Sequence, residues 1–312
     1  MLKETYIDLV TKYTNDSSLI IDLWTEIEQS YSDNKRHYHN ISHLDNLLIQ
    51  LVEVKDEIRN WETVLFTMFY HDLIYFATKS DNEEKSAELA EIRMKQINVP
   101  TEIIENCKTQ ILATKKHNDN SDFDTNFFID ADLSIFGQPE EIYEKYRKNV
   151  RLEYLYYPSV IFNKGRIQIL NYFLTQDGIF KTKYFKNKFE EQAKVNLNKE
   201  VELLEKYKYE FFFSHSNQFI FTIEDDGDWY EFFQDGAEIL KKTDGVEISN
   251  YYPGFFDSGY CRFIFKNVKL NLEYEGMLGI DLRTEPNPTD GDIIIAREIY
   301  EILKQVRNKN YA

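Results

Sequence analysis

The stretch that decides the fold is WETVLFTMFYHDLIYF, residues 61–76. Its apolar residues recur at three- and four-residue spacing, which predicts an amphipathic helix with its apolar face in a core. His71 and Asp72 stand near the end of this apolar run. Burial of an adjacent imidazole and carboxylate is costly unless a partner compensates them, and a divalent cation is such a partner. We therefore expect a helical core with a metal site at its edge.

Histidines cluster around this stretch. Five of the six in the chain lie close together in sequence, namely His37, His39, His43, His71 and His117. The segment RHYHNISH, residues 36–43, opens a second predicted helix, for which Ser42 is the expected N-cap. His39 then lies just before that helix and His43 lies in its first turn, so both imidazoles can face one cavity.

Further along the chain, two aspartates follow the apolar stretch TNFFI, residues 125–129. We expect Asp132 to complete a metal site with His43, His71 and Asp72, and Asp130 is the alternative to Asp132. Two imidazoles and two carboxylates form a mixed nitrogen and oxygen shell, which suits Mn, Fe, Mg, Ni or Zn. Four protein ligands leave positions open for water and substrate on a six-coordinate ion, an arrangement suited to hydrolysis.

These segments resemble a known family. A first histidine, a His-Asp pair about thirty residues later and a distant aspartate on a helical scaffold resemble the HD superfamily of metal-dependent phosphohydrolases. RHYHNISH, DNEEKSAELA, ATKKH and DADLSIFG are similar to the bacterial group called predicted metal-dependent HD-superfamily phosphohydrolases, over residues 1–206. The YHNxxH and ADLS spellings are also similar to the cyclic-nucleotide phosphodiesterases, although their glutamine-bearing purine clamp is not recognisable here.

The resemblance implies roles for individual residues. His43, His71, Asp72 and Asp132 would hold the cation, and Asp72 would also take part in catalysis. His39 matches the histidine that protonates the leaving group, with a supporting contact to a ligand or a water as its alternative role. The implied activity is cleavage of a phosphate ester of a nucleotide or a similar small molecule by water that the cation activates.

A small anionic phosphate-containing substrate needs local positive charge in an acidic chain. The candidates for substrate contacts are Arg36, Lys115 and Arg151. His117 is either a site residue, as a substrate contact or a second-metal ligand, or a solvated histidine at a helix end. Glu83 and Asp130 are candidates for orienting a ligand or a water.

Two other functions stay open. An HD-type di-iron oxygenase needs extra histidines around a second metal, for which only His117 and His39 could serve. A non-catalytic ligand-binding module would keep the fold without turnover.

Glycine distribution divides the chain of 312 residues into two parts. Three glycines fall in residues 1–206 and eight in residues 207–312. Long apolar-periodic runs predict an all-α domain over 1–206. Shorter aromatic and β-branched runs around two helices predict a small α+β accessory domain over 207–312, in the order β-α-β-β-β-α. This second domain could mediate homodimerisation or bind a protein partner.

Composition narrows the functional classes. The net charge of −17 argues against a nucleic-acid polymer or an anionic membrane as partner. Cys107 and Cys261 are too few for a disulfide framework, and the first residues, MLKETYIDLV, do not have the pattern of a secretion signal. We expect a cytoplasmic protein.

Overall fold

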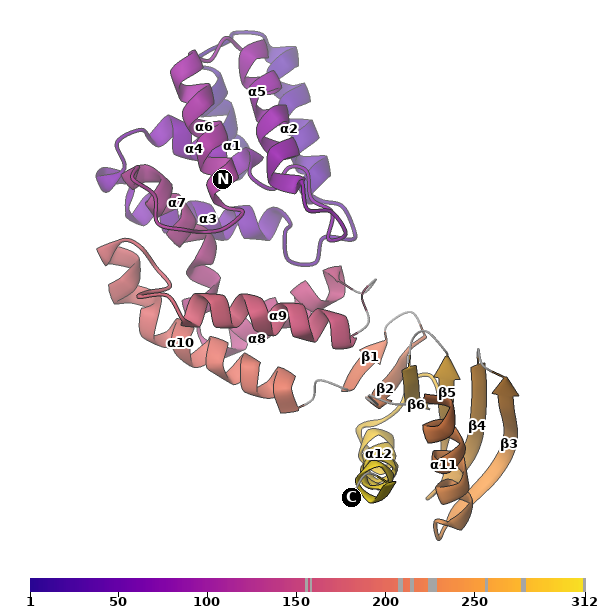
Figure 1. Ribbon diagram of the computed structural model, residues 1–312. Coiled ribbons are helices and arrows are strands. Elements are labelled where there is room, and N and C mark those ends of the chain that lie inside the picture. The colour runs from indigo at the N-terminus through magenta and orange to yellow at the C-terminus, as the bar shows by residue number, and fades with distance from the viewer. Residues whose placement is uncertain are drawn as a thin grey trace. The chain divides into compact units, whose positions relative to one another are not determined.

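A computed structural model describes residues 1–154, 157, 159–206, 210–213, 216–223, 229–255, 258–275 and 279–310. Contacts between backbone positions divide the chain into two compact units. The first comprises residues 1–156 and 168–201, and the second comprises residues 157–167 and 202–312. The sequence analysis places the boundary between 206 and 207. Each unit is described separately (Figure 1).

Helices build the part of the chain before the sheet (Figure 1). They are α1 (Leu2–Val10), α2 (Ser17–Tyr31), α3 (Ile41–Glu53), α4 (Trp61–Tyr70), α5 (Asn82–Gln96), α6 (Thr101–Ala113), α7 (Phe123–Leu133), α8 (Glu140–Glu153), α9 (Ser159–Leu174) and α10 (Lys183–Lys206). Two short 3₁₀ helices, η1 (Lys55–Glu57) and η2 (Ser134–Gly137), follow α3 and α7. The prediction of a helical domain is confirmed. Among the described residues, no helix combines the length and apolar character needed to cross a membrane.

Helix α4 is the centre of the first unit, where it contacts α1, α3, α5, α6 and α7. Every residue from Thr63 to Tyr70 is buried. The prediction of an amphipathic helix is therefore wrong, because α4 has neighbours all around it and carries no polar face. Inside the core, the Thr67 hydroxyl donates to the Thr63 carbonyl at 2.9 Å. His71 follows directly as the C-cap of α4, so the core itself fixes its position.

The start of α3 differs from the prediction by two residues. Asn40, not Ser42, is the N-cap, and its side-chain oxygen accepts a hydrogen bond from the Ser42 amide at 2.9 Å. Both residue types can cap a helix, and the earlier cap starts the helix two residues sooner, before His43. His43 remains in the first turn, as expected.

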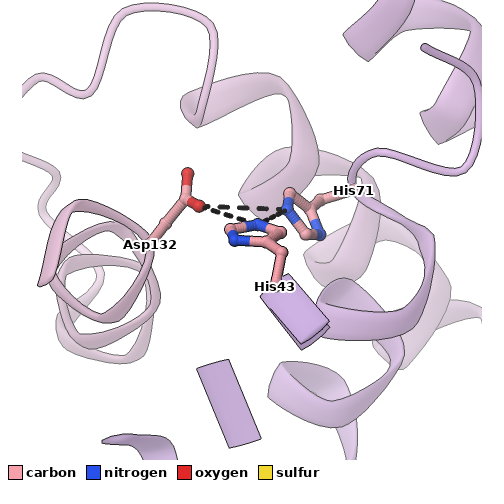
Figure 2. Close-up of side chains that lie close together, drawn as sticks. All are labelled: His43, His71 and Asp132. Atoms are coloured by element: carbon pink, nitrogen blue, oxygen red, sulfur yellow. Dashed lines mark hydrogen bonds and ion pairs between the residues drawn. The ribbon is translucent and has the colours of Figure 1, made fainter. Parts of the chain in front are cut away.

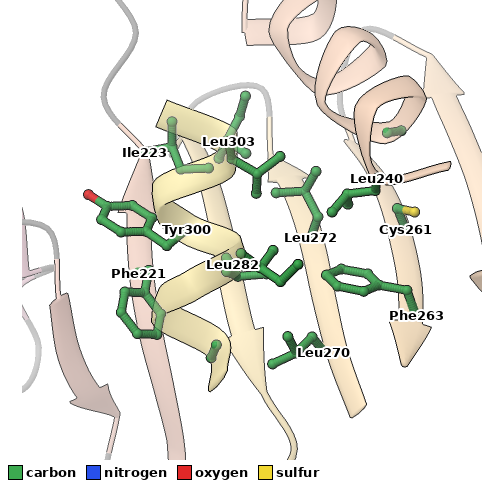
Figure 3. Packing of buried hydrophobic residues seen from close by; sticks show 14 of the residues in the cluster. Phe221, Ile223, Leu240, Cys261, Phe263, Leu270, Leu272, Leu282, Tyr300 and Leu303 are labelled. Atoms are coloured by element: carbon green, nitrogen blue, oxygen red, sulfur yellow. The ribbon is translucent and has the colours of Figure 1, made fainter. Parts of the chain in front are cut away.

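The second unit contains a six-stranded antiparallel sheet with the order β1-β2-β6-β5-β4-β3. The strands are β1 (Glu210–Phe213), β2 (Gln218–Ile223), β3 (Val246–Phe255), β4 (Ser258–Phe265), β5 (Val268–Glu275) and β6 (Gly279–Thr284). Helices α11 (Trp229–Lys242) and α12 (Asp290–Asn310) contact each other and pack on the sheet. Figure 3 shows the core between α12, α11 and the strands, where Phe221, Leu272 and Leu282 meet Tyr300 and Leu303.

The prediction of a small α+β domain is confirmed. The predicted order of its helices and strands along the chain is wrong. Among the described residues, two strands precede α11 where one was expected, and four lie between α11 and α12 where three were expected. Two of these four, β4 and β5, are joined by a tight turn at Lys266 and Asn267. Both turn residues have positive φ, 48° and 65°, as a two-residue hairpin of this kind requires. Alternating burial along β5 accounts for the strand character of the sequence, while the turn lacks the glycine that would have marked it.

Candidate metal centre

Three helix ends bring His43, His71 and Asp132 together (Figure 2). His43 lies in the first turn of α3, His71 caps α4, and Asp132 lies in the last turn of α7. Figure 2 shows the two imidazoles pointing at each other while the carboxylate faces them from a separate helix. One potential ligand atom from each residue lies within 4.8 Å of the other two. Segments far apart in sequence thus converge on one point.

The distances suit donors arranged around a shared ion. His43 Nε2 lies 3.2 Å from His71 Nε2 and 3.3 Å from Asp132 Oδ1. Asp72 Oδ2 lies 3.2 Å from His71 Nε2 and 3.9 Å from His43 Nε2. Both imidazoles are buried, whereas the side chains of Asp72 and Asp132 keep 19% and 16% exposure. The four expected ligands therefore meet, and their carboxylates face the accessible side.

The second nitrogen of His71 fixes the orientation of its ring. Nδ1 lies 3.0 Å from the Met68 carbonyl, which can only accept a hydrogen bond, so Nδ1 carries the proton. Nε2 of the neutral ring then presents a lone pair to the other donors, as a metal-ligating imidazole requires. Phe128 packs edge-on against the same ring at 5.4 Å between centroids and closes the core side of the site.

Charges in the site are strongly coupled. Burial opposes ionisation of Asp72 and Asp132, but the neighbouring imidazoles outweigh it and lower both carboxyl pKa values. Burial lowers the pKa of His43. For His71, burial acts in the same direction, but the Asp72 carboxylate outweighs it and raises the pKa to about 9. Binding of a cation would therefore displace a proton from His71.

Glu153, which the sequence analysis missed, holds His39 beside the cluster. Its Oε2 atom lies 2.6 Å from His39 Nδ1, and its Oε1 atom accepts from the backbone amides of Tyr38 and His39 at 2.7 and 2.9 Å. The Tyr75 hydroxyl donates to Oε2 at 2.9 Å, and the Tyr75 ring stacks on His39 at 4.2 Å. Burial opposes charging of His39, but Glu153 outweighs it and raises the pKa of the imidazole.

A sequence signal for Glu153 does exist. The buried residues of α8 are Tyr143, Tyr146, Val150 and Glu153, which follow each other at three- and four-residue spacing. A glutamate in register with the apolar face of a helix must find buried partners, because an unpaired carboxylate in a core is expensive. Here four hydrogen-bonding contacts compensate the burial of the Glu153 side chain, which is only 1% exposed.

Asp130 has contacts away from the cluster. Its carboxylate accepts from the backbone amides of Lys181 and Thr182 at 2.7 and 2.6 Å and from the Thr182 hydroxyl at 2.7 Å. It therefore anchors the segment that leads into α10. Of the two aspartates, Asp132 is the one beside the histidines, and the described contacts of Asp130 are with Lys181 and Thr182, not with a metal ligand as expected.

Arg36 was expected to contact a substrate phosphate. In the structure its guanidinium binds backbone carbonyl groups. Its Nη1 and Nη2 atoms donate to the carbonyls of Asp72 and Leu73 at 2.7 and 2.9 Å. The rings of Tyr31 and Tyr75 lie on it, at 5.0 and 5.6 Å from the guanidinium carbon. The geometry makes Arg36 a link between the segment before α3 and the turn that carries Asp72.

The other expected cations also have protein partners. Lys115 Nζ lies 2.5 Å from a Glu84 oxygen and 3.7 Å from Glu83, so Glu83 faces Lys115. Arg151 donates to the Tyr154 carbonyl at 2.8 Å, and burial lowers its pKa to about 10. The substrate roles of Lys115 and Arg151 stay predictions.

His117 joins the cluster from the loop between α6 and α7. Its Nε2 atom lies 3.1 Å from Asp132 Oδ2, the oxygen that does not face His43. Its backbone has a positive φ of 51°, a conformation that a non-glycine residue adopts only when its surroundings hold it there. Two roles were expected for His117. A role in the site fits this geometry better than that of a solvated histidine at a helix end.

Comparison of the chain with protein-family models, with curated proteins and with solved structures finds no match.

Proposed function

We propose that residues 1–206 form a metal-dependent phosphohydrolase domain of the HD superfamily that acts on a small phosphate ester. The observation that carries the proposal is the convergence of His43, His71 and Asp132 within 4.8 Å, with Asp72 beside both imidazoles. Such a set is typical of a divalent cation site with hard and borderline donors. The resemblance in sequence supplies the reaction class.

The donor chemistry fits a divalent cation. Two ionised carboxylates balance its charge, and two imidazole nitrogens complete a mixed shell. When bound, the cation would supply Lewis acidity for the phosphoryl group and for an attacking water. The exposed edges of Asp72 and Asp132 leave that side of the site open to a substrate.

His39 is suited to hold the proton that a leaving group needs. Glu153 raises the pKa of the ring, which favours the protonated imidazolium. With Nδ1 directed at Glu153, Nε2 is the position from which a proton can be given to an alkoxide. The His39 ring lies 5.8 Å from the His43 ring between centroids, so the proton donor and the ligands share one site.

The test begins with elemental analysis of the purified chain, followed by turnover of phosphate esters with added Mn²⁺. Three proteins are compared: the parent, Asp72→Ala, and Asp22→Ala as a matched control at an exposed aspartate of α2. We expect one cation per parent chain, and turnover that Asp72→Ala abolishes and Asp22→Ala leaves unchanged. Equal turnover in the parent and Asp72→Ala would contradict the proposal. Two irons per chain with oxygen consumption would instead identify an oxygenase.

A further inference from the structure

The two oxygens of the Asp132 carboxylate contact two different imidazoles. Oδ1 lies 3.3 Å from His43 Nε2, and Oδ2 lies 3.1 Å from His117 Nε2. The two contacts together fix the rotation of the carboxylate. A residue that holds a metal ligand in this way changes metal affinity without touching the ion. The groups that keep His117 beside Asp132 therefore matter for the site.

His117 depends on such groups because its backbone is left-handed. Its φ of 51° costs free energy for a residue that carries a Cβ atom. The His117 amide donates to the Ala113 carbonyl at 3.0 Å, which ties the backbone to the end of α6. A return to an ordinary backbone conformation would redirect the imidazole away from Asp132. The left-handed conformation therefore needs contacts from the surrounding structure.

Tyr172, on α9, contacts the chain on both sides of His117. Its hydroxyl has two acceptors within reach, the Lys116 carbonyl at 3.3 Å and the side-chain oxygen of Asn118. Lys116 and Asn118 are the immediate neighbours of His117 in the chain. A single hydroxyl thus bridges the residue whose backbone is left-handed.

The next residue of α9 supports the imidazole itself. The Phe173 ring packs edge-on against the His117 ring, at 5.9 Å between centroids. Phe173 is buried and also packs against Phe136, at 5.3 Å between centroids. Tyr172, in contrast, is 39% exposed, so its hydroxyl can be removed without opening the core. Phe173 supports the ring of His117, and Tyr172 holds the backbone that carries it.

We propose that Tyr172 is a positioning residue for the metal centre. Its hydroxyl keeps His117 in the left-handed conformation, His117 then holds Asp132 Oδ2, and Asp132 Oδ1 is presented to the cation. Tyr172 lies outside RHYHNISH, DNEEKSAELA, ATKKH and DADLSIFG, the segments that carry the resemblance in sequence. The effect of Tyr172 on metal binding rests on the proposed function, whereas the contact between His117 and Asp132 can be followed without a metal.

The test compares the parent with Tyr172→Phe, which removes the hydroxyl and keeps the ring. His117→Ala and the double variant complete a double-mutant cycle, and Tyr252→Phe is a matched control at an exposed tyrosine of β3. Calorimetric titration with Mn²⁺ gives the metal affinity of each protein. Circular dichroism and thermal melting confirm that each variant folds.

A second measurement follows His117 directly. NMR of the histidine ring nitrogens in the metal-free chain, at one fixed pH, reports the contact between His117 and Asp132. The His117 signals are assigned by their absence from His117→Ala. We expect these signals to move in Tyr172→Phe and to stay in place in Tyr252→Phe.

We expect Tyr172→Phe to weaken Mn²⁺ binding about tenfold and His117→Ala to weaken it by roughly 10–100-fold, as supporting contacts of metal ligands do. Because Tyr172 acts through His117, the double variant should bind no more weakly than His117→Ala. Tyr252→Phe should bind as the parent does.

Equal Mn²⁺ affinity in the parent and Tyr172→Phe, or unchanged His117 signals, would overturn the positioning role of Tyr172. The same loss of affinity from Tyr172→Phe with and without the His117 imidazole would also overturn it, because the effect would then be a general loss of packing. A parent chain that binds no Mn²⁺ would contradict the proposed function instead. The His117 signals alone would then decide whether Tyr172 positions His117.

Discussion

The Arg36 guanidinium donates a hydrogen bond to the backbone carbonyl of Asp72 at 2.7 Å and another to that of Leu73 at 2.9 Å. Arg36 lies on the segment that leads to His39 and His43, while Asp72 follows α4. These two bonds therefore connect the two halves of the candidate metal centre through backbone atoms. A planar guanidinium can make both at once, which a lysine ammonium cannot reproduce with the same geometry.

We predict that Arg36→Lys lowers the free energy of unfolding by about 1–3 kcal/mol, because one carbonyl loses a charged donor. Urea denaturation measures the change. Arg147→Lys is the control, since Arg147 pairs with Glu144 in a surface ion pair worth about 0–1 kcal/mol. If Arg36→Lys raised KM for a phosphate ester without a loss of stability, Arg36 would be a substrate contact, as the sequence analysis expected.

The two aspartates of α7 should separate metal binding from stability. Asp132→Asn removes a charged donor from the cluster, and we expect Mn²⁺ affinity to fall by at least ~100-fold, beyond the range seen for supporting contacts. Calorimetric titration of the metal measures it.

Asp130→Asn is the matched comparison, two residues away on the same helix. We expect it to keep the metal affinity within a few-fold and to lower the unfolding free energy by ~1–3 kcal/mol, because its contacts with Lys181 and Thr182 lose their charged acceptor. The reverse result, with metal affinity lost in Asp130→Asn and kept in Asp132→Asn, would assign the ligand to Asp130.

The pairing of His39 with Glu153 predicts a pH dependence. The folded chain raises the pKa of His39, so this pair contributes stability below the ordinary pKa of histidine, and the contribution is lost as pH rises through the raised value. NMR titration of the imidazole should show a pKa above 6.5 in the parent and a lower one in Glu153→Gln. An unchanged pKa in that variant would mean that Glu153 does not govern the charge of His39.

Gly137, at the end of η2, is packed too closely to accept a side chain. An added Cβ would lie 2.4 Å from the Phe189 Cβ and 2.7 Å from the Phe189 carbonyl oxygen. We predict that Gly137→Ala destabilises the chain by about 1–3 kcal/mol in thermal or chemical unfolding.

Gly165, within α9, provides the opposite case. An added Cβ there meets no atom within 4 Å, so Gly165→Ala should stabilise by roughly 0.5–1 kcal/mol through a higher helix propensity. Destabilisation by both substitutions to the same extent would show that close packing at Gly137 is not the cause.

Helix periodicity and residue chemistry predicted the helical part, the α+β part and the meeting of His43 and His71. These predictions were possible because each histidine lies at a helix end that the local sequence marks, and because two buried imidazoles favour a common partner. The HD family and the activity stay predictions. The turn at Lys266–Asn267 was missed, because both residues adopt positive φ without the glycine that usually signals it.

What the sequence by itself determined is the kind of side chain at each helix end. Only the tertiary structure decided which of them face one another. Asp130 and Asp132 are two residues apart, so on a helix with 3.6 residues per turn their side chains point to nearly opposite sides. The packing of α7 against α3 and α4 directs Asp132 to the histidines and Asp130 to the segment before α10. Glu153 and Arg36 acquire their partners in the same way, through contacts between residues distant in the chain, which local periodicity does not encode.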